Sequence, residues 1–141
     1  MLCAQKFLLA LYASKTDPNV KTQIAYAIMT TPKGAEPLIS LTNSEKDPAV
    51  RLKLIKILGT FSADKTGPAL AQLYSKEADK GTRSQILAGL LTQGNAKALI
   101  EIARAESDPE LKRLNIRYLS TMRSKDASDF LLEYLSKDSG K

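Results

Sequence analysis

Asp47-Pro48-Ala49-Val50-Arg51 is the stretch of this sequence that decides the fold, because versions of it occur at four places in the chain. Each version begins with Asp, has a mostly aliphatic residue three positions later, and ends with a basic residue at the fourth. The other three are Asp17-Pro18-Asn19-Val20-Lys21, Asp79-Lys80-Gly81-Thr82-Arg83 and Asp108-Pro109-Glu110-Leu111-Lys112. The aspartates are separated by 30, 32 and 29 residues, and a recurrence at that period indicates a repeat array.

Apolar residues recur in the same register around each aspartate. Those that lie nine, eight and six residues before it are Leu8, Leu9 and Leu11; Leu38, Ile39 and Leu41; Leu70, Ala71 and Leu73; and Leu99, Ile100 and Ile102. Those that lie seven, eight and eleven residues after it are Ile24, Ala25 and Ile28; Leu54, Ile55 and Leu58; Ile86, Leu87 and Leu90; and, with one polar exception, Asn115, Ile116 and Leu119. Both spacings are those of one face of a helix, so each copy should contain two helices.

The sequence therefore predicts an all-α protein. The expected helices cover residues 3–15, 18–30, 34–44, 48–60, 65–77, 80–92, 95–106, 109–121 and 125–136, with turn residues such as Pro32-Lys33-Gly34 and Gln93-Gly94-Asn95 between them. No segment alternates with period two, so we expect no sheet. We expect a single domain over residues 1–141, with repeats at 1–31, 32–61, 62–93 and 94–122 and a half repeat at 123–141.

Each aspartate has a predicted local role at the start of the second helix of its repeat. Its carboxylate can accept the free backbone N–H groups of the first turn, and a following Pro suits the first helical position. The third copy has Gly81 and Thr82 instead, so it should have the weakest start. When the copies stack, the aspartates and the bases should form an alternating ladder of charges. The predicted ladder residues are Asp17, Lys21, Asp47, Arg51, Asp79, Arg83, Asp108 and Lys112.

The composition excludes several kinds of chemistry. The chain has 141 residues, 43% of them hydrophobic and 26% charged, with a formal net charge of +6 and no histidine. Without histidine it lacks the usual zinc ligand and every Ser-His or Cys-His dyad, so we expect no catalytic residue, no metal and no cofactor. The single cysteine, Cys3, fits a reducing compartment and slightly favours the cytoplasm. Polar residues interrupt every apolar run, so we expect no membrane segment.

These features together resemble the HEAT repeat, and more closely the short HEAT-like repeats found also in phycobilisome-lyase-related proteins. The resemblance rests on the order helix, turn, Asp-Pro-x-Val-Arg, helix, and it covers essentially the whole chain. It implies a right-handed superhelix, or α-solenoid, in which the second helix of each repeat lines the concave side. It also implies that the Asp and the base form the contact between repeats. The third ladder start and Asn115 depart from the family pattern.

A concave face of this kind would present the second-helix residues that lie off the apolar stripe. These candidate partner-binding residues are Gln23, Tyr26, Lys53, Lys56, Gln85, Arg113 and Arg117. They predict a non-enzymatic scaffold that binds a protein or peptide, with an acidic one favoured by the four cations. An ordinary solvated helix face is the simpler interpretation of the same residues. The equivalent residues Tyr12 and Tyr74 should pack at the edge of the core.

Two other functions remain open. A basic concave groove could bind nucleic acid, as in the HEAT-like alkylpurine DNA glycosylases, although the third repeat supplies no cation and the chain has no Trp. A bilin lyase-like activity needs no histidine, but no residue can be assigned to it. Apolar residues at both ends, among them Phe7 and Leu135, also allow self-association through the terminal helices, or a chain that is a fragment of a longer array.

Overall fold

The computed structural model describes residues 2–139, and all the regular secondary structure in that range is helical. The helices are α1 (Leu2–Ser14), α2 (Pro18–Met29), α3 (Ala35–Ser44), α4 (Pro48–Leu58), α5 (Ala63–Lys76), α6 (Lys80–Thr92), α7 (Ala96–Ala105), α8 (Pro109–Thr121) and α9 (Lys125–Ser139). These bounds confirm the prediction of an all-α protein. The largest difference lies at α9, which continues to Ser139 instead of ending near residue 136.

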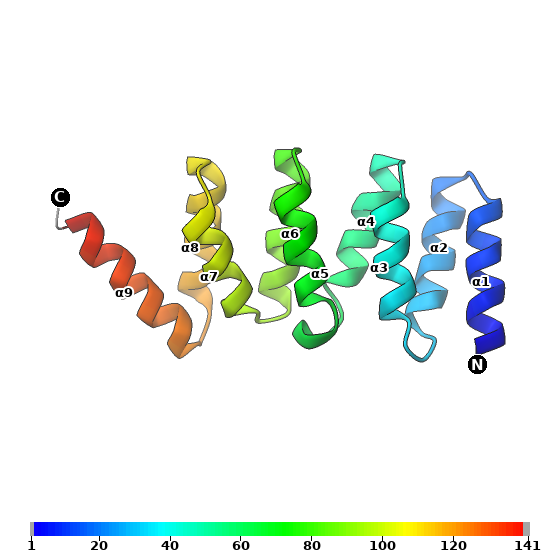
Figure 1. Cartoon of the computed structure of the whole chain (residues 1–141), viewed down its shortest axis with the longest axis horizontal. Helices are drawn as coiled ribbons and strands as arrows, with labels where there is room; N and C mark the ends of the chain where they lie inside the picture. The colour runs from blue at the N-terminus through cyan, green and yellow to red at the C-terminus, as the bar shows by residue number, and fades with distance from the viewer. Residues whose placement is uncertain (1, 140–141) are drawn as a thin grey trace.

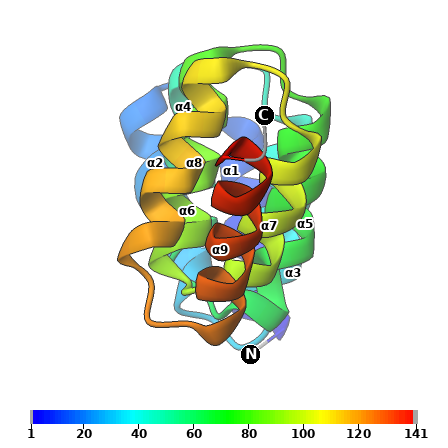
Figure 2. The same ribbon diagram turned by 90° about the vertical axis from the view of Figure 1, so that its left-hand side faces the viewer.

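The helices form two parallel layers along one axis (Figures 1 and 2). The second helices α2, α4, α6 and α8 pack on one another in sequence order, and α3, α5, α7 and α9 do the same in the other layer. Each first helix also packs on the second helix of its own pair, beginning with α1 on α2. Helices α1 and α9 lie at opposite ends, and α9 is inclined away from the direction of the other helices (Figure 1).

The core lies between the two layers and consists of the apolar stripes that the sequence predicts. In the first helices, Leu38, Leu70 and Leu99 are fully buried. In the second helices the buried stripe residues are Ile24, Ala25, Ile28, Leu54, Ile55, Leu58, Ile86, Leu87, Leu90 and Leu119. Full burial of a Leu or Ile side chain contributes about 1.5–3 kcal/mol, so the repeated stripe is the main source of stability.

The aspartates begin the second helices, which confirms their predicted capping role. The carboxylates of Asp17, Asp47 and Asp108 each accept two backbone N–H groups, as at Asn19 (2.8 Å) and Val20 (3.2 Å) in the first copy. Asp79 accepts one backbone N–H, that of Thr82, together with the Thr82 hydroxyl. The third start therefore has fewer backbone hydrogen bonds to the cap.

Asn115 takes an apolar position of the stripe but is fully buried. Its amide nitrogen donates to the Leu99 carbonyl at 2.8 Å, which connects α8 to the middle of α7. Such a bond offsets much of the cost of burying an amide. The Asn115 amide oxygen, in contrast, is buried without a hydrogen-bond partner among the described residues, so the departure from the repeat pattern is compensated only in part.

Candidate functional site

The candidate partner-binding residues lie along the layer of second helices. Lys53 and Lys56 on α4, and Arg113 and Arg117 on α8, are all exposed. On α2, Gln23 is exposed and Tyr26 has 44% of its surface accessible. Gln85 on α6 is half-buried. Because α2, α4, α6 and α8 pack in order, these residues belong to one face of the array, which we call the second-helix face.

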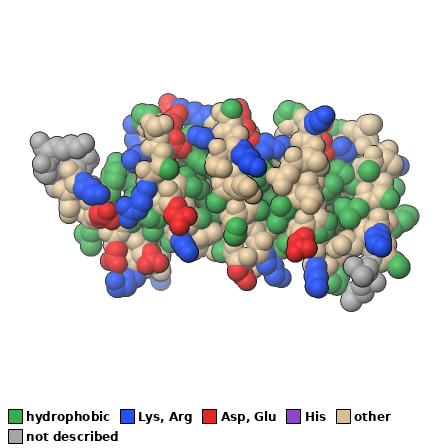
Figure 3. Space-filling view, in the orientation of Figure 1, with side chains coloured by type: hydrophobic (Ala, Val, Ile, Leu, Met, Phe, Trp, Pro, Cys, Tyr) green, Lys and Arg blue, Asp and Glu red, His purple; other side chains and the backbone are tan. Residues whose placement is uncertain are grey.

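The second-helix face has almost no negative charge of its own. Within the four second helices the one acidic residue is Glu110, in the first turn of α8. None of the four exposed cations, Lys53, Lys56, Arg113 and Arg117, forms an ion pair with any residue in the described range 2–139. The opposite side, where α3, α5 and α7 lie in front, carries acidic and basic side chains together (Figure 3).

Three of the four basic residues of the predicted ladder contact glutamates rather than the capping aspartates. Each of these three bases reaches across to a glutamate of the next helix pair. The pairs are Lys21–Glu45 (3.0 Å), Arg51–Glu77, and Arg83–Glu106 (3.5 Å). We call these three contacts the glutamate ladder. Each glutamate lies two residues before the next capping aspartate and also accepts the backbone N–H of that aspartate.

The expected pairing of Asp with base therefore needs correction, for a simple geometric reason. The Asp carboxylate is already engaged with the first turn of its own helix, whereas the glutamate lies in the turn that faces the preceding pair. One aspartate, Asp108, does pair across the interface, with Lys80 at 3.1 Å. The recurrence of Glu-x-Asp at Glu45, Glu77 and Glu106 is the sequence signal that could have revealed the ladder acids.

Tyr12 and Tyr74 belong to the same contacts. Both rings are buried, and each hydroxyl donates to a ladder glutamate of the next pair, Tyr12 to Glu45 and Tyr74 to Glu106. The cation of the same repeat lies over each ring, with Lys21 Nζ 5.0 Å from the Tyr12 centroid and Arg83 Cζ 4.6 Å from that of Tyr74. These tyrosines are thus part of the contact between pairs as well as of the core edge.

The ladder contacts change the acidity of the groups that form them. Burial by itself would raise the pKa of Glu45, but hydrogen bonds from the Tyr12 hydroxyl, the Asp47 N–H and Lys21 outweigh it and lower the pKa below 4.5. Burial acts in the same direction on the other two glutamates and is likewise outweighed. The pKa of Glu77 is lowered by hydrogen bonds from Arg51 and the Asp79 N–H, and that of Glu106 by the Tyr74 hydroxyl, the Asp108 N–H and the charge of Arg83. Burial, and then the bond to Glu45, raises the pKa of the Tyr12 phenol.

The lowered glutamate pKa values predict loss of stability in acid. A group whose pKa is lower in the folded state contributes stability above its unfolded pKa, and this contribution is lost as the pH falls through the folded value. We therefore expect the urea midpoint, followed by circular dichroism, to fall as the pH is lowered below 4.5. A triple Glu→Gln variant at 45, 77 and 106 should show a smaller fall. An equal fall in both proteins would contradict the role of the ladder.

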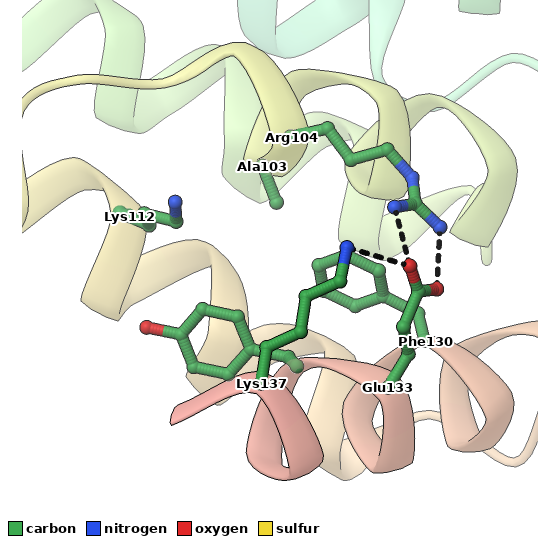
Figure 4. Close-up of a pocket in the computed structure, with 7 residues that line it drawn as sticks. Ala103, Arg104, Lys112, Phe130, Glu133 and Lys137 are labelled. Atoms are coloured by element: carbon green, nitrogen blue, oxygen red, sulfur yellow. Dashed lines mark hydrogen bonds and ion pairs between the residues drawn. The ribbon is translucent and has the colours of Figure 1, made fainter. Parts of the chain in front are cut away.

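A separate pocket of about 420 Å³ lies where α9 meets α7 and α8 (Figure 4). Arg104 on α7 makes two bonds to the Glu133 carboxylate on α9, at 3.2 and 2.9 Å, and Lys137 reaches the same carboxylate at 3.2 Å. Hydrogen bonds from these two cations lower the pKa of Glu133 to about 2. Lys112 on α8 borders the pocket without an acidic partner in the described part of the chain.

The fold and these contacts define the protein as a helical-repeat solenoid. A comparison with protein families then shows the family of repeats to which it belongs. The family model for HEAT repeats matches residues 5–91, and the chain belongs to the HEAT repeat family. Repeats of this family generally serve as non-enzymatic scaffolds for protein interaction. No curated protein matches the sequence. None of the described helices is both long and apolar enough to cross a membrane.

Proposed function

We propose that this protein is a non-enzymatic scaffold that binds an acidic segment of a partner protein on its second-helix face, which the family resemblance predicts to be concave. The observation that carries the proposal is the unbalanced charge of that face. Lys53, Lys56, Arg113 and Arg117 are exposed and unpaired within the described residues, and Glu110 is the one acid on the four second helices.

The spacing of the cations favours a peptide over a nucleic acid. The exposed, unpaired cations of this face occur on α4 and α8, whereas α6 between them has the neutral residues Gln85 and Ala88 at the positions equivalent to Lys53 and Lys56. Duplex DNA carries about one negative charge per 1.7 Å of its axis and is held best by continuous positive charge. Two separated basic groups match an acidic peptide whose carboxylates are themselves separated.

Tyr26 and Gln23 extend the face beyond its charged part. Tyr26 leaves 44% of its surface accessible, although most of the large apolar residues that the structure describes are at least partly buried. A half-exposed tyrosine offers apolar area together with a hydroxyl, and aromatic residues of this kind are enriched at protein interfaces. We therefore assign α2 the apolar part of the contact and α4 and α8 the charged part.

The test is a charge reversal on this face. A variant with Lys53, Lys56, Arg113 and Arg117 all changed to Glu should bind a labelled oligoglutamate peptide at least about tenfold more weakly than the parent protein, measured by fluorescence anisotropy at low salt. Helicity should remain, because all four side chains are exposed and lie off the buried stripe.

The matched control changes the same number of charges on the first helices. Lys6, Lys65, Lys76 and Lys97 are exposed there, and changing all four to Glu should leave most of the binding intact. An equal loss in both variants would show that only net charge matters and would overturn the assignment to this face. The nucleic-acid alternative is tested with labelled duplex DNA in place of the peptide. Tighter binding of the DNA than of the peptide, at the same salt concentration, would favour that alternative.

A further inference from the structure

Within the described residues 2–139, the glutamate ladder has a fourth base but no fourth glutamate. Lys112 lies four residues after Asp108, as Lys21, Arg51 and Arg83 lie after theirs. Those three each contact the glutamate of the following helix pair. Lys112 is half-buried and instead lies over the ring of Tyr134, with Nζ 5.6 Å from the centroid. A partly desolvated cation of this kind gains from an acidic partner.

The end of α9 explains why that partner is missing. Helices α3, α5 and α7 each end one residue before a ladder glutamate, and the glutamate itself has extended backbone. Tyr74 on α5 is followed three residues later by Glu77, whereas the residue three after Tyr134 is Lys137. No Asp-Pro follows it, and α9 continues as a helix to Ser139. The turn that would place a carboxylate beside Lys112 is therefore not formed.

The space beside Lys112 is the pocket between α7, α8 and α9 (Figure 4). Its volume of about 420 Å³ exceeds what one carboxylate side chain occupies. Three cations and one acid line it: Arg104, Lys112 and Lys137 against Glu133. Both oxygens of Glu133 are bound to Arg104, so this acid does not satisfy Lys112. The pocket retains an excess of positive charge.

We propose that this pocket binds a glutamate side chain from an acidic segment of a partner protein, which takes the place of the missing ladder glutamate. The carboxylate is held by Lys112 together with Lys137, whose bond to Glu133 at 3.2 Å is between exposed groups and is readily exchanged. The rings of Phe130 and Tyr134 line the same pocket and pack against the methylene groups of the glutamate. This end site is separate from the second-helix face and does not depend on its proposed function.

The chain itself supplies the sequence of the probe. Three ladder glutamates are followed by an aspartate two residues later, as in Glu106-Ser107-Asp108-Pro109. A capped peptide that contains the order Glu-Ser-Asp-Pro should therefore bind the full chain at this pocket. In NMR titrations of the isotope-labelled protein, the amide signals of Lys112, Tyr134 and Lys137 should shift and saturate. The same peptide with Gln in place of Glu should bind about tenfold more weakly, because it lacks the charge-assisted bonds.

Two variants test the residues, and circular dichroism checks the helicity of both. Lys112→Gln should weaken binding of the Glu peptide about tenfold. Lys137→Glu, at a side chain that is 73% exposed, should weaken it at least as much, because it reverses the charge at the pocket. Lys97→Gln, an exposed lysine on α7 outside this pocket, is the matched control and should have no effect.

Several results would overturn the proposal. These are equal affinity for the Glu and Gln peptides, unchanged binding by Lys112→Gln, or shifts confined to α4. Inorganic phosphate that binds the same residues more tightly than the peptide would make the pocket a general anion site instead. In the same titration, shifts of the Lys53 and Lys56 signals would show binding at the second-helix face. The failure of one site is therefore distinguishable from the failure of the other.

Discussion

Glu106→Ala should lower the free energy of unfolding by about 3 kcal/mol, since removing one partner of a buried ion pair leaves the others desolvated and unpaired. Glu106 is 9% exposed, accepts hydrogen bonds from the Tyr74 hydroxyl and the Asp108 N–H, and forms an ion pair with Arg83 at 3.5 Å. The substitution thus affects two helix pairs and the start of α8. Urea unfolding followed by circular dichroism measures the change.

Two further variants separate the role of Glu106 from general loss of charge. Glu101→Ala removes an exposed acid from α7, the helix that ends just before Glu106, and should change the unfolding free energy by less than about 0.5 kcal/mol. Glu106→Gln and Tyr74→Phe, alone and combined, form a double-mutant cycle whose coupling should be clearly positive, because the two side chains share one hydrogen bond. A small loss in Glu106→Ala, no larger than in Glu101→Ala, would show that the ladder does not stabilise the stack.

The helices could be predicted from the sequence because their start signals are local. An Asp at the cap and a Pro at the first position act within one turn, and the apolar stripes keep the same register around each aspartate. The exposure of Lys53 and Lys56 follows from the same helical period. What binds to them does not, because exposure on a repeat face is compatible with many partners.

The glutamate ladder could not be predicted from the rule that places the aspartates. A capping Asp bonds to its own helix, so the partner of Arg51 depends on the turn of the next helix pair. Glu77 belongs to that turn, distant from Arg51 in sequence, and only stacking brings the two together. The end site beside Lys112 is harder still to predict, since it depends on α9 continuing where the other first helices end.

Gly59 and Gly89 lie against each other where α4 meets α6, and their contact yields an asymmetric prediction. Gly59 ends α4, and a Cβ added there would lie 2.9 Å from the Gly89 Cα. Gly59→Ala therefore forces α4 and α6 apart and should cost about 1–3 kcal/mol of unfolding free energy, as overpacked core positions do. The main chain of α6 cannot yield as a flexible side chain would.

Gly89→Ala is the matched substitution on the other side of the same contact, and we expect the opposite sign. A Cβ on Gly89 would lie 3.5 Å from the Gly59 Cα and 3.7 Å from Leu70, which is ordinary packing distance. Ala in a helix interior is favoured over Gly by up to about 1 kcal/mol, so this variant should be neutral or more stable. Urea midpoints of the two variants, measured together, decide the point. The two variants should differ only if an added Cβ clashes at Gly59 and not at Gly89. Equal destabilisation of both would therefore contradict this difference between the two positions.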